Sequence, residues 1–523
     1  MAEADAVPQA AATPGQVRYG RADGRWVLLT TVLGSSMAFI DATVVNIALP
    51  HIGDEFKAGA AALQWTVNGY TLSLASLILL GGSLGDRFGR RRTFVIGVAW
   101  FAAASLLCGL APNIDTLIAA RVLQGAGGAL LTPGSLAIIE ASFHPDDRGR
   151  AIGAWSGLGG VAGAAGPFVG GWLVQAASWR LVFLINVPIA VAVCFLATRR
   201  VPESRDPAAP KRLDTPGVLT AAAGLAGLTY GFTAWPARGG GSPIVVGALL
   251  VGVCGLVGFV VTEQRSAQPM LPLNLFNSRA FSAVNLVTFA VYAAMGGVLF
   301  LVVLNLQVVV HFSALAAGTS MLPFTVLMLL LSARAGALAQ RIGPRIPMTV
   351  GPVLAALALV LFSRIGAHST YPRSVLPAVL LMGLGMATTV APLTATALGA
   401  VDERHAGIAS GVNNAVARAA GLLAVAVLPL AAGLGGGSLT NAADLGPMYH
   451  RAALICAAML VLGAVIAFVA VPAKLPSGDL AQAADSEPSL ETVGASPGHL
   501  NCLHCALDGT PLQPHAPHGE NER

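Results

Sequence analysis

Charged side chains are scarce in this sequence, at only 11% of its 523 residues, against roughly 25% in a typical soluble domain. So few charges cannot cover the surface of a water-soluble globule of this length. The short alternating segments of a membrane β-barrel are missing too. The apolar residues come instead in blocks of about 20, each long enough to cross a bilayer as a helix. The sequence therefore predicts an all-α polytopic membrane protein.

The absence of other motifs excludes some classes of function. No Walker pattern is present, so ATP is not the expected energy source, and no His/Asp or Ser/Lys constellation in the blocks indicates an enzyme. We expect no cofactor. Basic residues lie in short loops, where they fit control of membrane topology better than nucleic-acid binding. Four of the six cysteines read as small hydrophobic residues within apolar blocks: Cys108, Cys194, Cys254 and Cys456.

Fourteen apolar blocks can be counted along the chain. We expect spans at 26–50, 62–82, 93–111, 116–140, 149–174, 180–199, 214–234, 243–262, 281–306, 316–338, 345–365, 373–399, 407–432 and 450–471. Most of the 30 Lys and Arg residues then lie in loops on the side of the N-terminus, as Arg87, Arg148 and Arg199 do. Because such loops stay inside, both termini are expected to be cytoplasmic.

An internal repeat divides the blocks. The loop from Gly82 to Arg91 resembles the one from Gly336 to Arg345, 254 residues further on, and 146–148 resembles 402–404 at an offset of 256. The repeat predicts two related six-helix bundles with two inserted helices between them. The expected domains are a cytoplasmic tail at 1–25, bundles at 26–199 and 281–472, a linker with the inserted helices at 200–280, and a disordered cytoplasmic tail at 473–523.

Several segments resemble the major facilitator superfamily and, within it, the fourteen-span drug:proton antiporters. They are 82–92 after the second span, 117–127 in the fourth, Gly157 with 166–171 in the fifth, 41–50 in the first and 179–188 at the sixth. The resemblance covers nearly all of 26–471. It implies a proton-coupled transporter in the cell membrane that handles small molecules, and we expect it to act as a monomer.

The resemblance also implies roles for two motifs. One is expected to hold a gate in one conformation, and its residues are Gly82, Asp86, Arg87, Gly89 and Arg90. A solvated turn at Asp86 is the alternative interpretation. The other is the antiporter motif, in which small residues allow close helix packing. Its residues are Gly157, Gly166, Pro167, Gly170 and Gly171.

Three charges lie well inside the spans, at Asp41, Arg121 and Arg418, where each costs about 2.5–3.5 kcal/mol on insertion scales. Asp41 and Arg121 have similar depths, roughly 13 and 9 Å below the outer face at the helical rise per residue. We hypothesise that Asp41 takes the coupling proton and that Arg121 tunes it. The alternative is a structural ion pair that never titrates. Asp214, before Pro216, predicts a helix cap.

The sequence indicates the residues of the substrate cavity less clearly than it indicates the buried charges. Candidate lining residues are Phe39, Asn46, Tyr70, Trp155 and Arg418, although aromatic residues in spans more often only pack. In the C-terminal tail, Cys502 and Cys505 form one Cys-x-x-Cys pair, which is too little to predict a metal site.

The leading hypothesis is proton-driven export of drug- or antibiotic-like compounds. Alternatives are a dedicated exporter of one natural product, a proton-coupled importer of a nutrient or siderophore, and a polytopic enzyme or metal sensor. One deep carboxylate in the first six spans predicts one proton per cycle and neutral or monovalent substrates.

Overall fold

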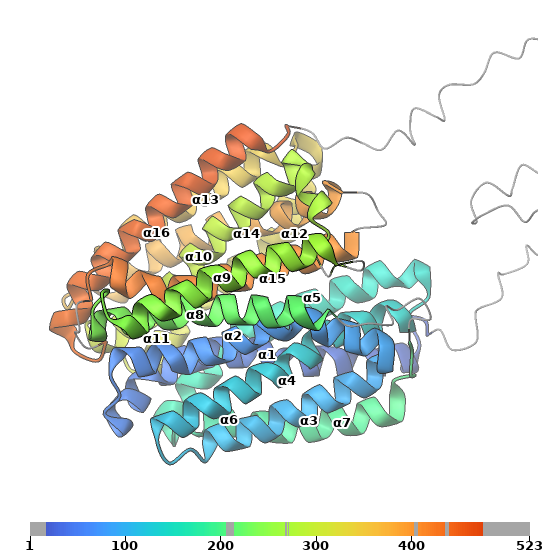
Figure 1. Cartoon of the computed structure of the whole chain (residues 1–523), viewed down its shortest axis with the longest axis horizontal. Coiled ribbons are helices and arrows are strands. Elements are labelled where there is room, and N and C mark those ends of the chain that lie inside the picture. Colours follow the sequence, from blue (N-terminus) through green and yellow to red (C-terminus); the bar gives the residue numbers. More distant parts are fainter. Residues whose placement is uncertain are drawn as a thin grey trace, which may run out of the picture. The chain divides into compact units, whose positions relative to one another are not determined.

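The computed structural model describes residues 17–205, 214–266, 269, 271–401, 406–434 and 439–473. These residues are almost entirely helical and include no β-strand, only an isolated bridge between Val17 and Phe143. Long helices run side by side through the coloured part of the molecule (Figure 1). The predicted all-α class is confirmed. The tail cysteines Cys502 and Cys505 and the second short repeat at 402–404 lie outside the described residues.

Seven helices lie in the described part of the chain before residue 201. They are α1 (Ala22–Phe56), α2 (Ala60–Phe88), α3 (Arg90–Gly109), α4 (Ile114–Ser142), α5 (Pro145–Ala176), α6 (Leu181–Leu184) and α7 (Asn186–Arg200). α4 packs against α2 and α3, and α1 packs against α5. The Asn113 side chain caps α4 by accepting a hydrogen bond from the Thr116 N–H at 2.9 Å. The predicted sixth span is divided between α6 and α7.

α8 (Thr215–Arg238) and α9 (Pro243–Arg265) lie where the sequence predicts two inserted helices. Asp214 caps α8, with its carboxylate 2.9 Å from the Gly217 N–H, as the sequence predicts. Glycines let the two helices touch: a Cβ on Gly227 would lie 2.5 Å from the Gly252 nitrogen. α8 also packs against α2 and against the later helix α15 (Ala406–Ala431), so it joins both parts of the chain.

The remaining helices follow α9. They are η1 (Leu273–Asn277), α10 (Arg279–Val308), α11 (Ala314–Ser320), α12 (Leu322–Ile342), α13 (Arg345–Phe362), η2 (Tyr371–Val375), α14 (Leu376–Gly399), α15 and α16 (Ala442–Ala470). The predicted tenth span is divided between α11 and α12. Pro323 lies directly after this division, and its ring cannot continue the hydrogen bonds of the preceding turn.

Twelve helices of the described part are long and apolar enough to cross a membrane, and the bent helix α2 is a thirteenth if its two segments count as one. α5 has 32 residues but is not among them. Several α5 side chains lie outside the described part of the structure, so α5 is not counted among these helices. The chain is thus a multi-pass membrane protein, and the number fourteen stays a prediction.

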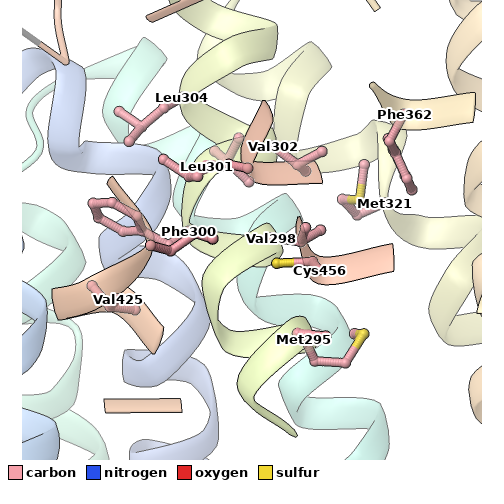
Figure 2. Packing of buried hydrophobic residues seen from close by; sticks show 14 of the residues in the cluster. Met295, Val298, Phe300, Leu301, Val302, Leu304, Met321, Phe362, Val425 and Cys456 are labelled. Atoms are coloured by element: carbon pink, nitrogen blue, oxygen red, sulfur yellow. The ribbon is translucent and has the colours of Figure 1, made fainter. Parts of the chain in front are cut away.

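α10 lies at the centre of the larger hydrophobic core. It packs against α1, α14, α15 and α16. Figure 2 shows Val298, Leu301 and Val302 of α10 with Cys456 of α16 and Val425 of α15 around it. The same core includes Val44 to Ile52 from the second half of α1, whereas the first half of α1 packs in a separate cluster with α3 and α4. Among the described residues, helices from before and after the α8–α9 pair share a hydrophobic core along the second half of α1.

Candidate functional site

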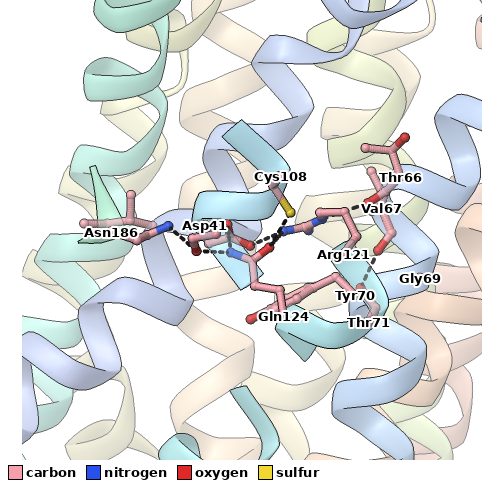
Figure 3. A network of polar contacts seen from close by, with 12 residues as sticks. Asp41, Thr66, Val67, Gly69, Tyr70, Thr71, Cys108, Arg121, Gln124 and Asn186 are labelled. Atoms are coloured by element: carbon pink, nitrogen blue, oxygen red, sulfur yellow. Dashed lines mark hydrogen bonds and ion pairs between the residues drawn. The ribbon is translucent and has the colours of Figure 1, made fainter. Parts of the chain in front are cut away.

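The buried charges of α1 and α4 form an ion pair. Arg121 Nη1 lies 2.6 Å from Asp41 Oδ2, and the two side chains are 1% and 0% exposed (Figure 3). Breaking such a pair by removing one partner typically costs about 3–5 kcal/mol, because the other charge is left uncompensated. The sequence placed these residues at similar depths, and the structure brings them into direct contact.

Other helices fix the Arg121 guanidinium. Its Nε donates to the Thr66 carbonyl of α2 at 2.9 Å. Its Cζ lies 4.4 Å from the ring centroid of Tyr70 and 5.7 Å from that of Phe183. The planar guanidinium suits such combined stacking and multiple hydrogen bonding better than a lysine ammonium does. The position of Arg121 therefore depends on α1, α2 and α6 together.

Gln124 joins the two ends of the ion pair. One turn after Arg121 on α4, its carbonyl accepts from Arg121 Nη1 at 2.6 Å, and its amide donates to Asp41 Oδ1 at 2.8 Å. The same amide reaches Ser105 of α3 at 2.7 Å, and Asn186 of α7 donates to Ser105 at 3.4 Å. Both oxygens of Asp41 are thus occupied. Sequence reasoning assigned no role to Gln124, although its spacing from Arg121 places both on one helix face.

A cavity of about 380 Å³ lies beside this network. Its walls come from α1, α2, α4, α10, α14 and α15. Tyr70, whose ring stacks on Arg121, also lines the cavity, so one side chain links the ion pair to the space where a ligand would fit. The volume falls within the range of about 300–1,000 Å³ that is usual for small-molecule sites.

Three of the five residues predicted to line the substrate cavity do so in the structure, and two are not among its described lining residues. Phe39, Tyr70 and Arg418 line the cavity. Trp155 and Asn46 are not among its described lining residues: the Trp155 indole donates to Ser35 at 3.0 Å, and Asn46 Oδ1 is buried without a hydrogen-bond partner in the described part of the chain.

The predicted gate residues lie at the junction of α2 and α3: Gly82, Asp86 and Arg87 are in the last turns of α2, Gly89 lies between the helices, and Arg90 begins α3. Asp86 pairs with Arg90 at 2.8 Å, and Gly89 has φ 116°, a conformation that other residues rarely adopt. A Cβ on Gly82 would make only ordinary contact, 3.8 Å from Pro133, and the Arg87 guanidinium lies 5.1 Å from the Phe88 ring centroid.

Glu203 holds the start of α3, a contact that sequence reasoning missed. Its carboxylate accepts from the N–H groups of Arg91 and Arg92 at 3.0 and 3.2 Å, and Arg91 Nε lies 3.6 Å away. An acidic side chain at a helix N-terminus is stabilised by the exposed N–H groups and the helix dipole. Glu203 lies about 110 residues beyond α3's start in sequence, so no local pattern connects the two.

The glycines of the predicted antiporter motif form close contacts of α5 with α1 and α11. A Cβ on Gly166 would collide with the Thr43 hydroxyl, and one on Gly170 would lie 2.8 Å from Val44. One on Gly171 would lie 2.6 Å from the Ala314 carbonyl oxygen. Pro167 contacts Gly318 of α11 through its carbonyl. For Gly157, the structure describes only its place within α5.

Two long-range hydrogen bonds accompany these contacts. Gln307 of α10 donates to the Ile47 carbonyl at 3.1 Å, and Gln64 of α2 donates to the Val425 carbonyl of α15 at 2.9 Å. On α1, these contacts begin at Ile47, whereas the cavity lining lies between Ser35 and Ala42. Among the described residues, these contacts join the parts of the chain before and after the α8–α9 pair at one end of the bundle, beyond the cavity.

The sequence model of the Major Facilitator Superfamily matches residues 31–425, most of the chain. The chain belongs to the major facilitator superfamily. This match covers the ion pair, most of the cavity wall and the contacts that join the two parts of the chain.

Curated relatives of this superfamily member are resistance and export proteins. The tetracenomycin C resistance and export protein of Streptomyces glaucescens is 37% identical over 77% of this chain and 74% of its own length. The puromycin resistance protein pur8 of Streptomyces alboniger is 34% identical over 89% of this chain and 94% of its own length. The multidrug resistance protein Stp of Mycobacterium tuberculosis strain H37Rv is 36% identical over 77% of this chain and 74% of its own length.

Solved structures show the same superfamily fold. A bacterial homologue of the human lysosomal transporter Spinster, described as inward-facing and unoccupied, matches with a TM-score of 0.60 at 18% identity over 86% of this chain and 97% of that one. A POT family transporter in complex with 5-aminolevulinic acid matches with a TM-score of 0.65 at 12% identity over 87% and 97%. At these identities the likeness concerns the fold alone.

Proposed function

We propose that this protein exports drug- or antibiotic-like small molecules in exchange for protons by alternating access. The observation that supports this most strongly is the fully buried Asp41–Arg121 pair beside the cavity. Ionisable residues inside a membrane are costly and commonly mark ion or substrate pathways. The printed names of the relatives, which include export, drug resistance and multidrug resistance, agree with this proposal.

The network gives the proton and the substrate a common contact. A proton on Asp41 cancels the charge that neutralises Arg121, whose other described hydrogen-bond partners, Gln124 and the Thr66 carbonyl, are uncharged. Arg121 in turn stacks on Tyr70, which lines the cavity. We infer that occupancy of the cavity and protonation of Asp41 influence each other through Arg121 and Tyr70.

Alternating access requires the joined end of the bundle to separate. The contacts of Gln307, Gln64 and Gly171 would break, and equivalent contacts would form at the other end. We propose that the joined end faces the outside, because the Arg-rich loops at the opposite end are expected to remain in the cytoplasm. Both termini then lie in the cytoplasm, and the protein works as a monomer that binds protons and a small molecule.

The test uses inside-out vesicles with an acid interior, containing the wild type or Asp41→Asn, and a panel of antibiotics and of lipophilic cations and anions. Uptake of a compound and loss of the pH gradient are followed together. We expect wild-type vesicles to show both and Asp41→Asn vesicles to show neither at equal protein content. Asp115→Asn, at an exposed carboxylate in the first turn of α4, is the matched control and should behave as the wild type.

Continued exchange of protons for substrate by Asp41→Asn would show that Asp41 is structural. Wild-type vesicles that move no compound of the panel would contradict broad export. Export of one compound alone would favour a dedicated exporter, the candidate that the single antibiotics in the names of the tetracenomycin C and puromycin proteins support.

A further inference from the structure

Arg418 faces the cavity from the middle of α15. Asn413, Asn414, Ala417 and Arg418 all line the cavity, and their spacing puts them on one face of the helix. Arg418 therefore presents its charge to the space where a substrate would fit, and α1 residues on both sides of Asp41 in sequence line the same space. Asp41 already neutralises Arg121, so the Asp41–Arg121 pair does not need the charge of Arg418 and assigns no role to it.

The charge of Arg418 has no partner within the described part of the chain. Its Nε is buried without a hydrogen bond, and none of its atoms takes part in an ion pair there. The ionisable groups that interact electrostatically with it are Tyr70 and Tyr292, and no Asp or Glu is among the described residues that line the cavity. The cavity is therefore electropositive.

An uncompensated charge at this depth is expensive, and a ligand of opposite charge would remove the cost. A guanidinium matches a carboxylate with two parallel hydrogen bonds. Tyr70 and Tyr292 add ring faces and hydroxyl donors to the cavity lining, and Phe39 adds apolar surface. A cationic ligand would find no counter-charge among these residues.

We propose that the central cavity selects substrates that carry an acidic group, a carboxylate or a phenol ionised at neutral pH, on an aromatic body, with Arg418 binding the acidic group. This deepens the proposed export function and rests on it. Tyr70 contacts both Arg121 and the cavity, so binding of the anion at Arg418 takes place one side chain away from the proposed proton site.

The test measures binding to the purified full chain in nanodiscs, without a proton gradient. Three probes share one ring system and differ in charge: anthracene carboxylate, anthracene carboxamide and the aminomethyl cation of anthracene. We expect the wild type to bind the carboxylate about tenfold more tightly than the carboxamide, as a charge-assisted contact predicts, and the cation most weakly. Arg418→Gln should bind the carboxylate and the carboxamide equally, with its carboxamide affinity unchanged.

Two further variants make the result specific. Arg334→Gln removes an exposed arginine of α12 and should keep the full preference for the carboxylate. If Arg418→Gln loses both probes, Arg418→Lys decides: a retained preference for the carboxylate supports the proposal, and loss of both probes again overturns it. A wild type without preference, a wild type that binds none of the probes, or an unchanged preference in Arg418→Gln also overturns it.

Different results would contradict the proposed role of Arg418 and the proposed export function. Charge selection by Arg418 without proton-driven transport would contradict only the export function. Transport that depends on Asp41 without charge selection would contradict only the role of Arg418.

Discussion

Gln124 shows how much of the site depends on one side chain. It accepts from Arg121 and donates to both Asp41 and Ser105, so it occupies the second oxygen of the Asp41 carboxylate and joins α4 to α1 and α3. Buried polar groups that are fully hydrogen-bonded fix a single arrangement, whereas one missing member leaves its partners unsatisfied. The geometry of the ion pair therefore depends on a neutral residue.

We predict that Gln124→Leu lowers the free energy of unfolding by about 1–3 kcal/mol, because Asp41 Oδ1 is left buried without its donor. Unfolding of the purified protein in mixed detergent, followed by tryptophan fluorescence, measures the change. Gln175→Leu, at an exposed glutamine of α5, is the matched control. Equal stability of the two variants would show that the network adds nothing to the fold.

At the scale of the elements, α5 and α11 meet through backbone rather than through side chains. Gly171 lies against the backbone of Ala314 and Leu315, and Gly318 lies against the Pro167 carbonyl. Small residues allow this approach, because packing in lipid relies on close contact. The contact belongs to the joined end of the bundle, so its stability affects the balance between the two conformations of an alternating-access cycle.

We predict that Gly171→Val disfavours the joined end. The new Cβ would lie 2.6 Å from the Ala314 carbonyl oxygen, and backbone there cannot yield as a flexible side chain would. Overpacking typically costs about 1–3 kcal/mol, enough to shift the equilibrium between conformations about tenfold. Faster hydrogen exchange of the amides in 314–320 and slower transport should follow.

Gly153→Val is the control for this prediction. It lies on the same helix, and a Cβ there meets nothing within 4 Å. Unchanged exchange in Gly171→Val, or an equal change in both variants, would show that the α5–α11 contact does not govern closure.

For the whole molecule, the α8–α9 pair decides how the two parts of the chain are connected. α8 packs against α2 from the first part and α15 from the second, while α9 has few buried residues. An inserted pair returns the chain to the same side of the membrane, so the parts before and after it keep the same orientation. The Arg-rich loops then remain on one side, as the positive-inside rule requires.

Reporter fusions test this arrangement. We predict that alkaline phosphatase is inactive when fused at either terminus, because the positive-inside rule predicts both to be cytoplasmic, and active when inserted between α8 and α9, at 239–242. Phosphatase between α3 and α4, at 110–113, should also be active and serves as a positive control. An active fusion at the C-terminus together with an inactive one at the N-terminus would place the termini on opposite sides of the membrane. The number of spans would then be odd, which would contradict the fourteen-span prediction.

The all-α membrane class followed from composition and from the lengths of the apolar blocks, because the bilayer constrains both directly. Asp214 as a helix cap is equally local, since it depends on residues within one turn. The depths of Asp41 and Arg121 also follow from the sequence, because the helical rise converts position into height. The break between α11 and α12 depends on local detail that block counting overlooks.

Only the tertiary structure decided which side chains meet. Gln124 on α4 reaches Asp41 and Ser105 on two other helices, and Glu203 caps α3 from about 110 residues away. The same holds for Arg418, which lacks a charged partner among the described residues because of what the other helices pack around it. Sequence determines what a residue can do and how deep it lies, whereas contacts between distant segments depend on helix rotation and packing, which no local pattern encodes.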